Sequence, residues 1–286
     1  MIQGPATISV SGGRSSGLML RMLLDEHGGG LPPDVVPIFA NTGEEAEGTL
    51  IFVREMAERW NVPIRWVEFS AEARADAHFA DVAHWREVDY CSASRKGEPF
   101  DAMIDWKKML PSDGKRFCTE WLKVRAMLGF AASLGFPVAR VRDDNGRTTT
   151  QADFDQYLGI RADEPRRVAK NRNRAHVELP LVARGITRGD VLAFWKAQPF
   201  DLQIRTGEGN CNFCFEKGLT QLRNVARAAP DGAGLQRWIA REARIGATMK
   251  KAHAYTEIDT FVRRQLPMLS AEPEEDPDLL PCACGD

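Results

Sequence analysis

The chain has 286 residues, of which 43% are hydrophobic and 27% charged, and its formal net charge is −2. These values are ordinary for a globular protein, and the net charge makes no overall electrostatic case for nucleic-acid binding. No apolar run approaches the roughly 20 residues of a membrane span. The first ten residues lack the basic-then-apolar pattern of a signal peptide. We therefore expect a cytoplasmic protein that does not bind membranes.

The N-terminal part alternates between short apolar runs and amphipathic stretches. Residues 7–13 predict a strand that runs into glycines and serines, and residues 16–27 predict a helix. Residues 35–43 predict a second strand with a polar turn, 44–60 an amphipathic helix, and 63–69 a third strand. This order predicts an α/β fold, a doubly wound, mostly parallel sheet with helices on both faces.

The later part of the chain is less regular. Residues from about 71 to 112 are polar and aromatic and predict an insertion or lid. The further predicted elements are a helix over 119–135 with Thr119 as its N-cap, strands over 154–164 and 175–182, and a helix over 187–198.

These elements predict an α/β domain over residues 1–205. A helical, cysteine-bearing C-terminal part follows over residues 206–286 and ends in an acidic, proline-rich, extended tail.

The stretch SGGRSSG, residues 11–17, lies between the first predicted strand and helix. Glycines let a backbone approach a ligand closely, and a helix N-terminus offers N–H groups to an anion. Three serine hydroxyls and Arg14 add further donors. No Gly-Lys-Ser/Thr closes the stretch, so it is not the common phosphate loop. By itself it predicts either a phosphate-binding turn or an ordinary strand–helix turn.

This stretch resembles the pyrophosphate loop (PP-loop) of the adenine nucleotide alpha hydrolase superfamily, Ser-Gly-Gly-x-Asp/Thr-Ser. Ser11, Gly12, Gly13, Ser15 and Ser16 match, with Ser15 at the position where many members carry Asp. Those enzymes split ATP between its α and β phosphates, adenylate a substrate and release pyrophosphate. The resemblance implies an adenine nucleotide alpha hydrolase-like fold and ATP with Mg²⁺ as the ligand.

Four further segments resemble the phosphoadenosine phosphosulfate reductase family within that superfamily. They are FANTGEE (39–45), RFCTEWLKV (116–124), LGIRADEPRR (158–167) and LPLVARGITRGDVLAFW (179–195). The resemblance admits a sulfonucleotide in place of ATP. The nucleotide-binding residues implied by these segments and by the loop are Ser9, Ser11, Gly12, Gly13, Arg14, Ser15, Ser16, Asn41, Thr42, Gly43 and Arg161.

Arg161 follows a predicted parallel strand, at the end where ligands bind in such sheets. Its guanidinium could grip phosphate or sulfate bidentately, and the alternative is an ion pair with Asp163 or Glu164. A basic run follows with Arg166, Arg167 and Lys170. Such a run is usually a solvated face, but it could also meet a nucleic-acid backbone or a second phosphate.

Cys211 and Cys214 have the two-residue spacing that lets one turn present two thiolates to a metal. Cys118 stands at the start of a predicted helix, where the dipole would lower its pKa. In cluster-bearing adenylylsulfate reductases, a Cys-Cys pair and a later Cys-x-x-Cys pair hold a [4Fe–4S] cluster. The resemblance implies the same ligands here, with Phe117 in place of the first cysteine.

Several arrangements remain open for these thiols. Three thiolates could leave one iron open, as in sulfur-inserting tRNA thiolases of the superfamily, or a fourth ligand could come from Cys91, Cys282 or Cys284. Zinc on the same ligands and unrelated free thiols are the alternatives. The ending Cys284-Gly285 resembles faintly the mobile nucleophile of thiol-dependent reductases, and it could equally be a ligand or serve no function.

The sequence therefore favours an enzyme that adenylates a substrate and supports iron–sulfur-dependent sulfur transfer to a nucleotide or to a nucleic acid, either tRNA or DNA. A sulfur-donor protein would be its partner. One alternative is a reductase that releases sulfite from phosphoadenylylsulfate, with Arg161 and Cys284 as catalytic residues and a thioredoxin-like partner. The other is a non-catalytic nucleotide- or nucleic-acid-binding protein with structural zinc. An oligomer is compatible with each.

Overall fold

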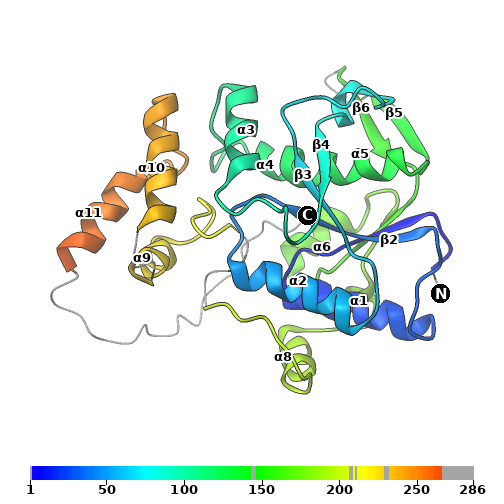
Figure 1. The fold of residues 1–286 in the computed structure, drawn as a ribbon. Coiled ribbons are helices and arrows are strands. Elements are labelled where there is room, and N and C mark those ends of the chain that lie inside the picture. Colours follow the sequence, from blue (N-terminus) through cyan, green and yellow to red (C-terminus); the bar gives the residue numbers. More distant parts are fainter. Residues whose placement is uncertain (1, 143–145, 206–208, 210, 229–231, 266–286) are drawn as a thin grey trace.

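A computed structural model describes residues 2–142, 146–205, 209, 211–228 and 232–265. Its centre is a six-stranded sheet in the order β4-β3-β2-β1-β7-β8 (Figure 1). All neighbouring strands run parallel except β4, which pairs antiparallel with β3 at one edge. The strands are β1 (Ala6–Ser9), β2 (Val35–Asn41), β3 (Arg65–Phe69), β4 (Trp85–Val88), β7 (Asp155–Leu158) and β8 (Val177–Glu178).

Both faces of the sheet are covered by helices, as predicted. Helices α1 (Arg14–Glu26), α2 (Glu47–Arg59) and α8 (Arg188–Lys196) share one apolar cluster with Phe39 of β2. Helix α5 (Ala126–Ser133) packs on the opposite face against Ile38 and Ala40 of the same strand. Successive strand residues point to opposite faces, so β2 is apolar along nearly its whole length.

The other helices lie around the edges of this core, and α9, α10 and α11 gather at one end of the molecule (Figure 1). No helix in the described ranges is long and apolar enough to span a membrane. These remaining elements are the 3₁₀-helix η1 (Ala80–Val82), α3 (Glu98–Lys107), α4 (Phe117–Thr119), the π-helix η2 (Glu120–Arg125), α6 (Pro165–Asn171), α7 (Pro180–Ala183), α9 (Leu219–Ala228), α10 (Ala233–Ile245) and α11 (Tyr255–Gln265).

The segment 71–112 contains the edge strand β4 and helix α3, and its role as an insertion or lid stays a prediction. Two other sequence predictions need correction. The helix predicted from Thr119 begins at Phe117, with Arg116 before it, and passes through a π-helical turn. The strand predicted over 175–182 ends at Glu178, because Pro180, which cannot donate to a sheet, begins α7 instead.

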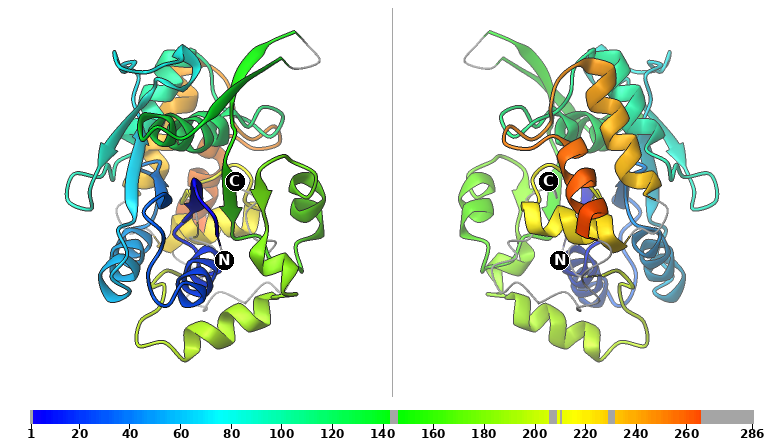
Figure 2. Two further views of the ribbon diagram at one scale, coloured as in Figure 1. Left: turned by 90° about the vertical axis from the view of Figure 1, so that its right-hand side faces the viewer. Right: turned by 90° about the vertical axis from the view of Figure 1, so that its left-hand side faces the viewer.

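The structure also contains a hairpin that the sequence pattern did not predict. Strands β5 (Val138–Arg142) and β6 (Thr148–Ala152) pair antiparallel as a separate sheet. They extend away from the body of the molecule (Figure 2). In β5 two arginines alternate with small apolar residues, and β6 is mostly threonine, so the hairpin has little apolar surface of its own and depends on contacts with the domain.

Asp81 attaches this hairpin to the domain. Its carboxylate accepts hydrogen bonds from the backbone N–H and the hydroxyl of Thr150, both at 2.7 Å. It also pairs with Arg125 at 2.8 Å and Arg140 at 2.7 Å. Burial disfavours the carboxylate, but the bonds from Thr150 and Arg125 outweigh it and lower the pKa of Asp81.

We expect Asp81→Asn to destabilise the protein by about 1–3 kcal/mol and to speed amide exchange in β5–β6, because these charge-assisted bonds are lost. Since folding lowers the pKa of Asp81, its contribution exists above the usual carboxyl range and disappears as the pH falls through the lowered value. Hydrogen exchange and urea unfolding across pH measure both effects. Asp76→Asn, which removes only an exposed pair with Arg74, is the control. Equal exchange in the two variants would contradict this attachment.

Candidate functional site

The turn between β1 and α1 is organised by Ser16. Its hydroxyl accepts a hydrogen bond from the Ser11 N–H at 3.1 Å and donates to the Gly13 carbonyl at 3.0 Å. The Ser11 and Ser16 hydroxyl oxygens lie 3.0 Å apart. Ser16 is buried, so these bonds fix the turn from the inside. Within the predicted loop, this serine shapes the backbone.

Two glycines set the direction of the turn. Gly12 has φ +75°, and a Cβ there would lie 2.4 Å from Thr49 Cγ2 on α2. Gly13 is the N-cap of α1, and no side chain caps that helix end. The first N–H groups of a helix have no partners within the helix, and the dipole makes this end positive. This combination is favourable for binding an anion.

Arg14 holds the turn against a distant segment. Its guanidinium forms a bidentate pair with Asp201, at 2.7 and 2.9 Å, and also donates to the Leu202 carbonyl. The Trp195 indole N–H of α8 donates to the Arg14 carbonyl at 2.8 Å. Arg14 therefore lies beside the predicted ligand position with its charge already balanced by Asp201.

The end of β7 approaches this turn so closely that only glycine fits at position 159. A Cβ on Gly159 would lie 2.7 Å from the Cα of Ser16. Two residues later, Arg161 donates a hydrogen bond to the Ser15 hydroxyl at 3.2 Å. The structure thus brings together two segments that are far apart in the sequence.

Arg161 also forms the local ion pair that the sequence analysis gave as the alternative to anion binding. Its Nε lies 2.8 Å from Asp163, and its backbone N–H donates to Glu164 at 2.9 Å. Burial disfavours ionised Asp163, but the bonds from the Arg188 N–H and from Arg161 outweigh it and lower the pKa of Asp163. Only 11% of the Arg161 side chain is exposed, so Asp163 fixes the guanidinium beside Ser15.

A cleft of about 480 Å³ opens over the turn. Glu164 is the single carboxylate residue that lines it, within the described part of the chain. Of the predicted nucleotide-binding residues, the lining includes Ser9, Ser11, Gly13, Arg14, Ser15, Ser16 and Arg161. Its basic residues are Arg14, Lys123, Arg161, Arg167, Arg174, Arg188 and Arg205.

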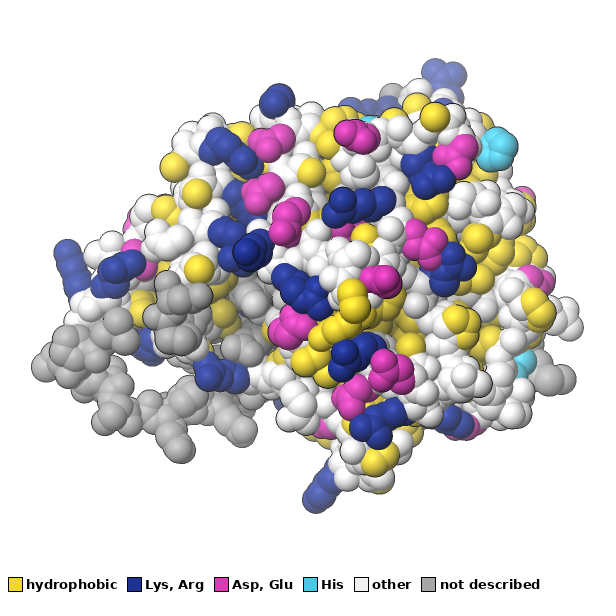
Figure 3. Space-filling model, viewed as in Figure 1, with side chains coloured by type: hydrophobic (Ala, Val, Ile, Leu, Met, Phe, Trp, Pro, Cys, Tyr) yellow, Lys and Arg dark blue, Asp and Glu magenta, His cyan; other side chains and the backbone are white. Residues whose placement is uncertain are grey.

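This excess of basic side chains is local. On the face drawn in Figure 3, basic and acidic side chains are interspersed, in keeping with the net charge of −2. A cleft of one charge sign with low-dielectric walls concentrates its field on a ligand of opposite charge. The cleft is therefore suited to an anion with several charges.

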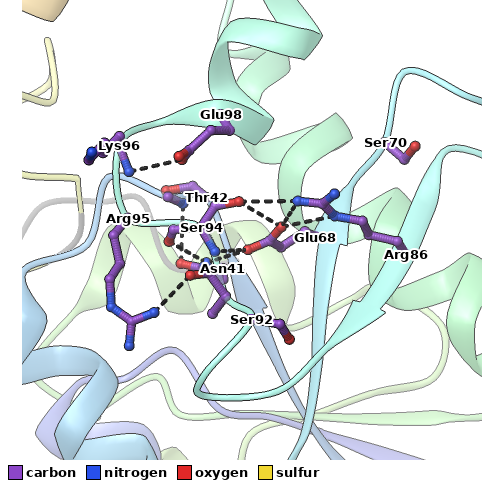
Figure 4. A network of polar contacts seen from close by, with 12 residues as sticks. Asn41, Thr42, Glu68, Ser70, Arg86, Ser92, Ser94, Arg95, Lys96 and Glu98 are labelled. Atoms are coloured by element: carbon purple, nitrogen blue, oxygen red, sulfur yellow. Dashed lines mark hydrogen bonds and ion pairs between the residues drawn. The ribbon is translucent and has the colours of Figure 1, made fainter.

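The predicted residues at the end of β2 do not line this cleft. Asn41 is buried and donates to Glu68 at 2.6 Å and to the Ser94 carbonyl at 2.9 Å. Glu68 in turn binds Arg86 and the Ser94 N–H (Figure 4). Gly43, φ +75°, donates its N–H back to the Asn41 side chain. The contacts of Asn41 and Gly43 are structural, and their role in nucleotide binding stays a prediction.

The same turn connects the sheet to the cysteine segment. The Thr42 hydroxyl donates to the Glu45 carboxylate at 2.8 Å and lies 3.5 Å from Cys211 Sγ. Residue 45 also forms an isolated β-bridge with Cys211. Glu45 is fully enclosed, and its burial raises its pKa. The turn after β2 therefore contacts the first thiol of the Cys-x-x-Cys pair.

The three cysteines predicted as metal ligands are all buried in one apolar cluster, with side chains of α3, α9, α10 and α11. Cys118 comes from α4, while Cys211 and Cys214 precede α9. Burial raises the pKa of Tyr255 well above its usual value, and nearby Cys214 raises it further. In the part of the chain that the structure describes, no three His, Cys, Asp or Glu side chains are arranged to hold a metal ion. The metal centre stays a prediction.

Cys91, one of the proposed fourth ligands, is exposed and lies outside this buried cluster. The other two, Cys282 and Cys284, lie outside the described residues, as does the predicted acidic tail.

Sequence reasoning missed several residues of the cleft. Of the basic run after Arg161, only Arg167 lines it, whereas Arg174 and Arg188 come from later segments. Lys123 lies one turn beyond Cys118, and a helical projection of that segment could have placed it opposite Trp121. The sequence carries no local signal for Arg205.

The fold and this site together define an α/β protein with a basic ligand cleft at the carboxyl ends of parallel strands. No family model matches the chain. The chain is 29% identical over 260 residues to an uncharacterized nin region protein, ORF290, of Escherichia phage lambda. The similar region covers 91% of this chain and 81% of the phage protein.

We expect Gly159→Ala to destabilise the protein by about 1–3 kcal/mol, because the new methyl group overlaps the backbone of Ser16. Urea unfolding measures the change. Gly30→Ala is the matched control, since a Cβ there meets nothing within 4 Å. Equal stability of the two variants would contradict the close approach of β7 to the turn.

Proposed function

We propose that this protein is an adenine nucleotide alpha hydrolase-like enzyme that cleaves ATP between its α and β phosphates to adenylate a substrate for sulfur transfer. The observation that carries the proposal is the contact of Arg161 with Ser15 inside the basic cleft. It joins the PP-loop-like turn to the Gly-x-Arg segment. Each of these two motifs resembles the superfamily by itself, and they lie far apart in the sequence.

The nucleotide's phosphates would lie over the uncapped N-terminus of α1, between the Ser11 and Ser15 hydroxyls. Arg161, held by Asp163, would bind a non-bridging phosphate oxygen and offset negative charge as the α phosphate becomes five-coordinate. Mg²⁺ would neutralise the departing pyrophosphate. A lysine that contacts a γ phosphate is not needed, because that phosphate is not transferred.

In this reaction an oxygen of the acceptor attacks the α phosphorus, and the bond between α phosphorus and the bridging oxygen breaks. Pyrophosphate leaves with the electron pair of that bond. A persulfide of a donor protein then attacks the carbon or phosphorus that bears the adenylated oxygen, and AMP leaves with that oxygen. A second thiolate of the donor attacks the resulting S–S bond, which leaves one sulfur on the acceptor and a disulfide on the donor. The acceptor is proposed to be a nucleotide or a nucleic acid.

The three buried cysteines are proposed to serve the sulfur-transfer half of the reaction. Their connection to the nucleotide half runs through the turn after β2, where Thr42 contacts Cys211. Lys123, one turn after Cys118, lines the nucleotide cleft. A [4Fe–4S] cluster would supply sulfur binding, but the described residues form no metal-holding group, and no step here depends on one.

We expect the protein to bind Mg-ATP and to form AMP and pyrophosphate in the presence of its acceptor. Arg161→Ala should weaken nucleotide binding about 10- to 100-fold, which corresponds to losing a charge-assisted hydrogen bond of about 1.5–3 kcal/mol. Calorimetry measures binding, and chromatography separates the products.

Arg59→Ala is the control, because Arg59 pairs with Glu55 on α2 and does not line the cleft. Formation of ADP and phosphate would contradict α–β cleavage. Sulfite release from phosphoadenylylsulfate with thioredoxin, without use of ATP, would assign the protein to the reductases instead.

We expect anaerobically purified protein to contain about four irons per chain, with broad absorption near 400 nm. Cys214→Ser should lose most of the iron, and Cys91→Ser, which changes an exposed thiol, should keep it. Metal analysis and the absorption spectrum measure both outcomes. Zinc without iron would contradict sulfur transfer on an iron–sulfur centre.

A further inference from the structure

Arg174 and Arg188 differ from two other arginines of the cleft, because no carboxylate of the described residues pairs with them. Arg14 pairs with Asp201, and Arg161 pairs with Asp163. The Arg174 guanidinium donates to the Asn171 side chain at 2.8 Å, and within the described ranges neither it nor the Arg188 side chain has an ion pair. Both side chains line the cleft and belong to exposed residues. Their charges are therefore available to a ligand.

Arg174 lies near the outer edge of the sheet, and Arg188 begins α8 beside the segment that follows β7. The nucleotide turn follows β1, and β7 with Arg161 lies next to it in the strand order. Arg174 precedes the edge strand β8, and the Arg188 N–H donates to Asp163 at 3.0 Å. The basic side chains of the cleft thus extend from the turn after β1, past the end of β7 and the start of α8, toward the edge strand β8. A nucleotide with its phosphates on the turn does not account for the outer pair.

We propose that Arg174 and Arg188 bind the phosphate backbone of a single-stranded nucleic acid, which is the acceptor in the proposed reaction. This inference rests on the proposed function, because it names the substrate that would lie beside the bound nucleotide. Guanidinium groups match phosphate oxygens in geometry and charge. Leu192, a 45% exposed apolar residue, and Val177 line the same cleft and provide contact for a sugar or base.

The size of the cleft favours a single strand. A cavity of about 480 Å³ has the dimensions of a small-molecule pocket and does not admit a duplex. A nucleotide from a single strand, or one flipped out of its helix, can enter such a pocket. Phosphates on the outer arginines would hold the strand while one nucleotide reached toward the α phosphate of ATP.

The test is binding of fluorescein-labelled single-stranded DNA and RNA oligonucleotides, followed by anisotropy over a salt series. We expect Arg174→Glu/Arg188→Glu to weaken binding about 10- to 100-fold. In the milder Arg174→Ala/Arg188→Ala variant, the negative slope of log K against log salt should become shallower by about 1.4, because two phosphate contacts are removed. Comparison of DNA with RNA identifies the kind of strand.

The matched control is Arg172→Glu/Lys196→Glu. It makes the same change in charge with exposed residues next to α6 and on α8 that do not line the cleft. Equal losses in the two double variants, no binding of either oligonucleotide, or equal binding of a poly-glutamate peptide would overturn the proposal. A comparable loss of Mg-ATP affinity in Arg174→Glu/Arg188→Glu would overturn a second, separate subsite. Circular dichroism confirms that the variants fold.

The two proposals can fail separately. Oligonucleotide binding that depends on Arg174 and Arg188, in a protein that does not cleave ATP, would leave the nucleic-acid site standing and remove the adenylation reaction. ATP cleavage that proceeds with a small-molecule acceptor, in a protein that binds no oligonucleotide, would do the reverse.

Discussion

The site depends on the close approach of β7 to the first turn of α1. Gly159 lies so near Ser16 that no side chain fits between them, and this contact lets the segment after β7 lie directly against the turn. Because of it, Arg161 reaches the Ser15 hydroxyl, and the serine-rich turn and the arginine form one wall of a cleft. A wider spacing of β1 and β7 would leave an uncapped helix end and a surface ion pair with no common ligand.

Two pairs of arginines in this cleft differ in whether a carboxylate holds them. Arg14 and Arg161 carry carboxylate partners that hold them in place, and each still lines the cleft. A paired guanidinium keeps donors for a ligand without the cost of leaving an isolated charge in a partly buried position. Arg174 and Arg188 are more exposed, so water can solvate them until an anion binds. The pairing thus distinguishes two arginines held by carboxylates from two exposed arginines of the same cleft.

The turn after β2 connects the central sheet with the cysteine segment through buried polar contacts. Asn41 and Glu68 hold the turn on the sheet, and Glu44 pairs with the buried Arg241 of α10 at 2.7 Å. The helices that enclose the cysteines are thereby attached to a strand end of the central sheet.

The sequence alone determined the α/β alternation, the serine-glycine turn and the burial pattern of the first strands, because these follow from local periodicity and turn chemistry. It did not determine that Pro180 would shorten β8, that 138–152 would form a hairpin, or that Asn41 would turn inward. The hairpin and the orientation of Asn41 depend on Asp81 and Glu68, which are distant in the sequence. Only the tertiary structure decided that Arg174 and Arg188 share a cleft with Ser11 and Ser15, because strand order brought their segments together.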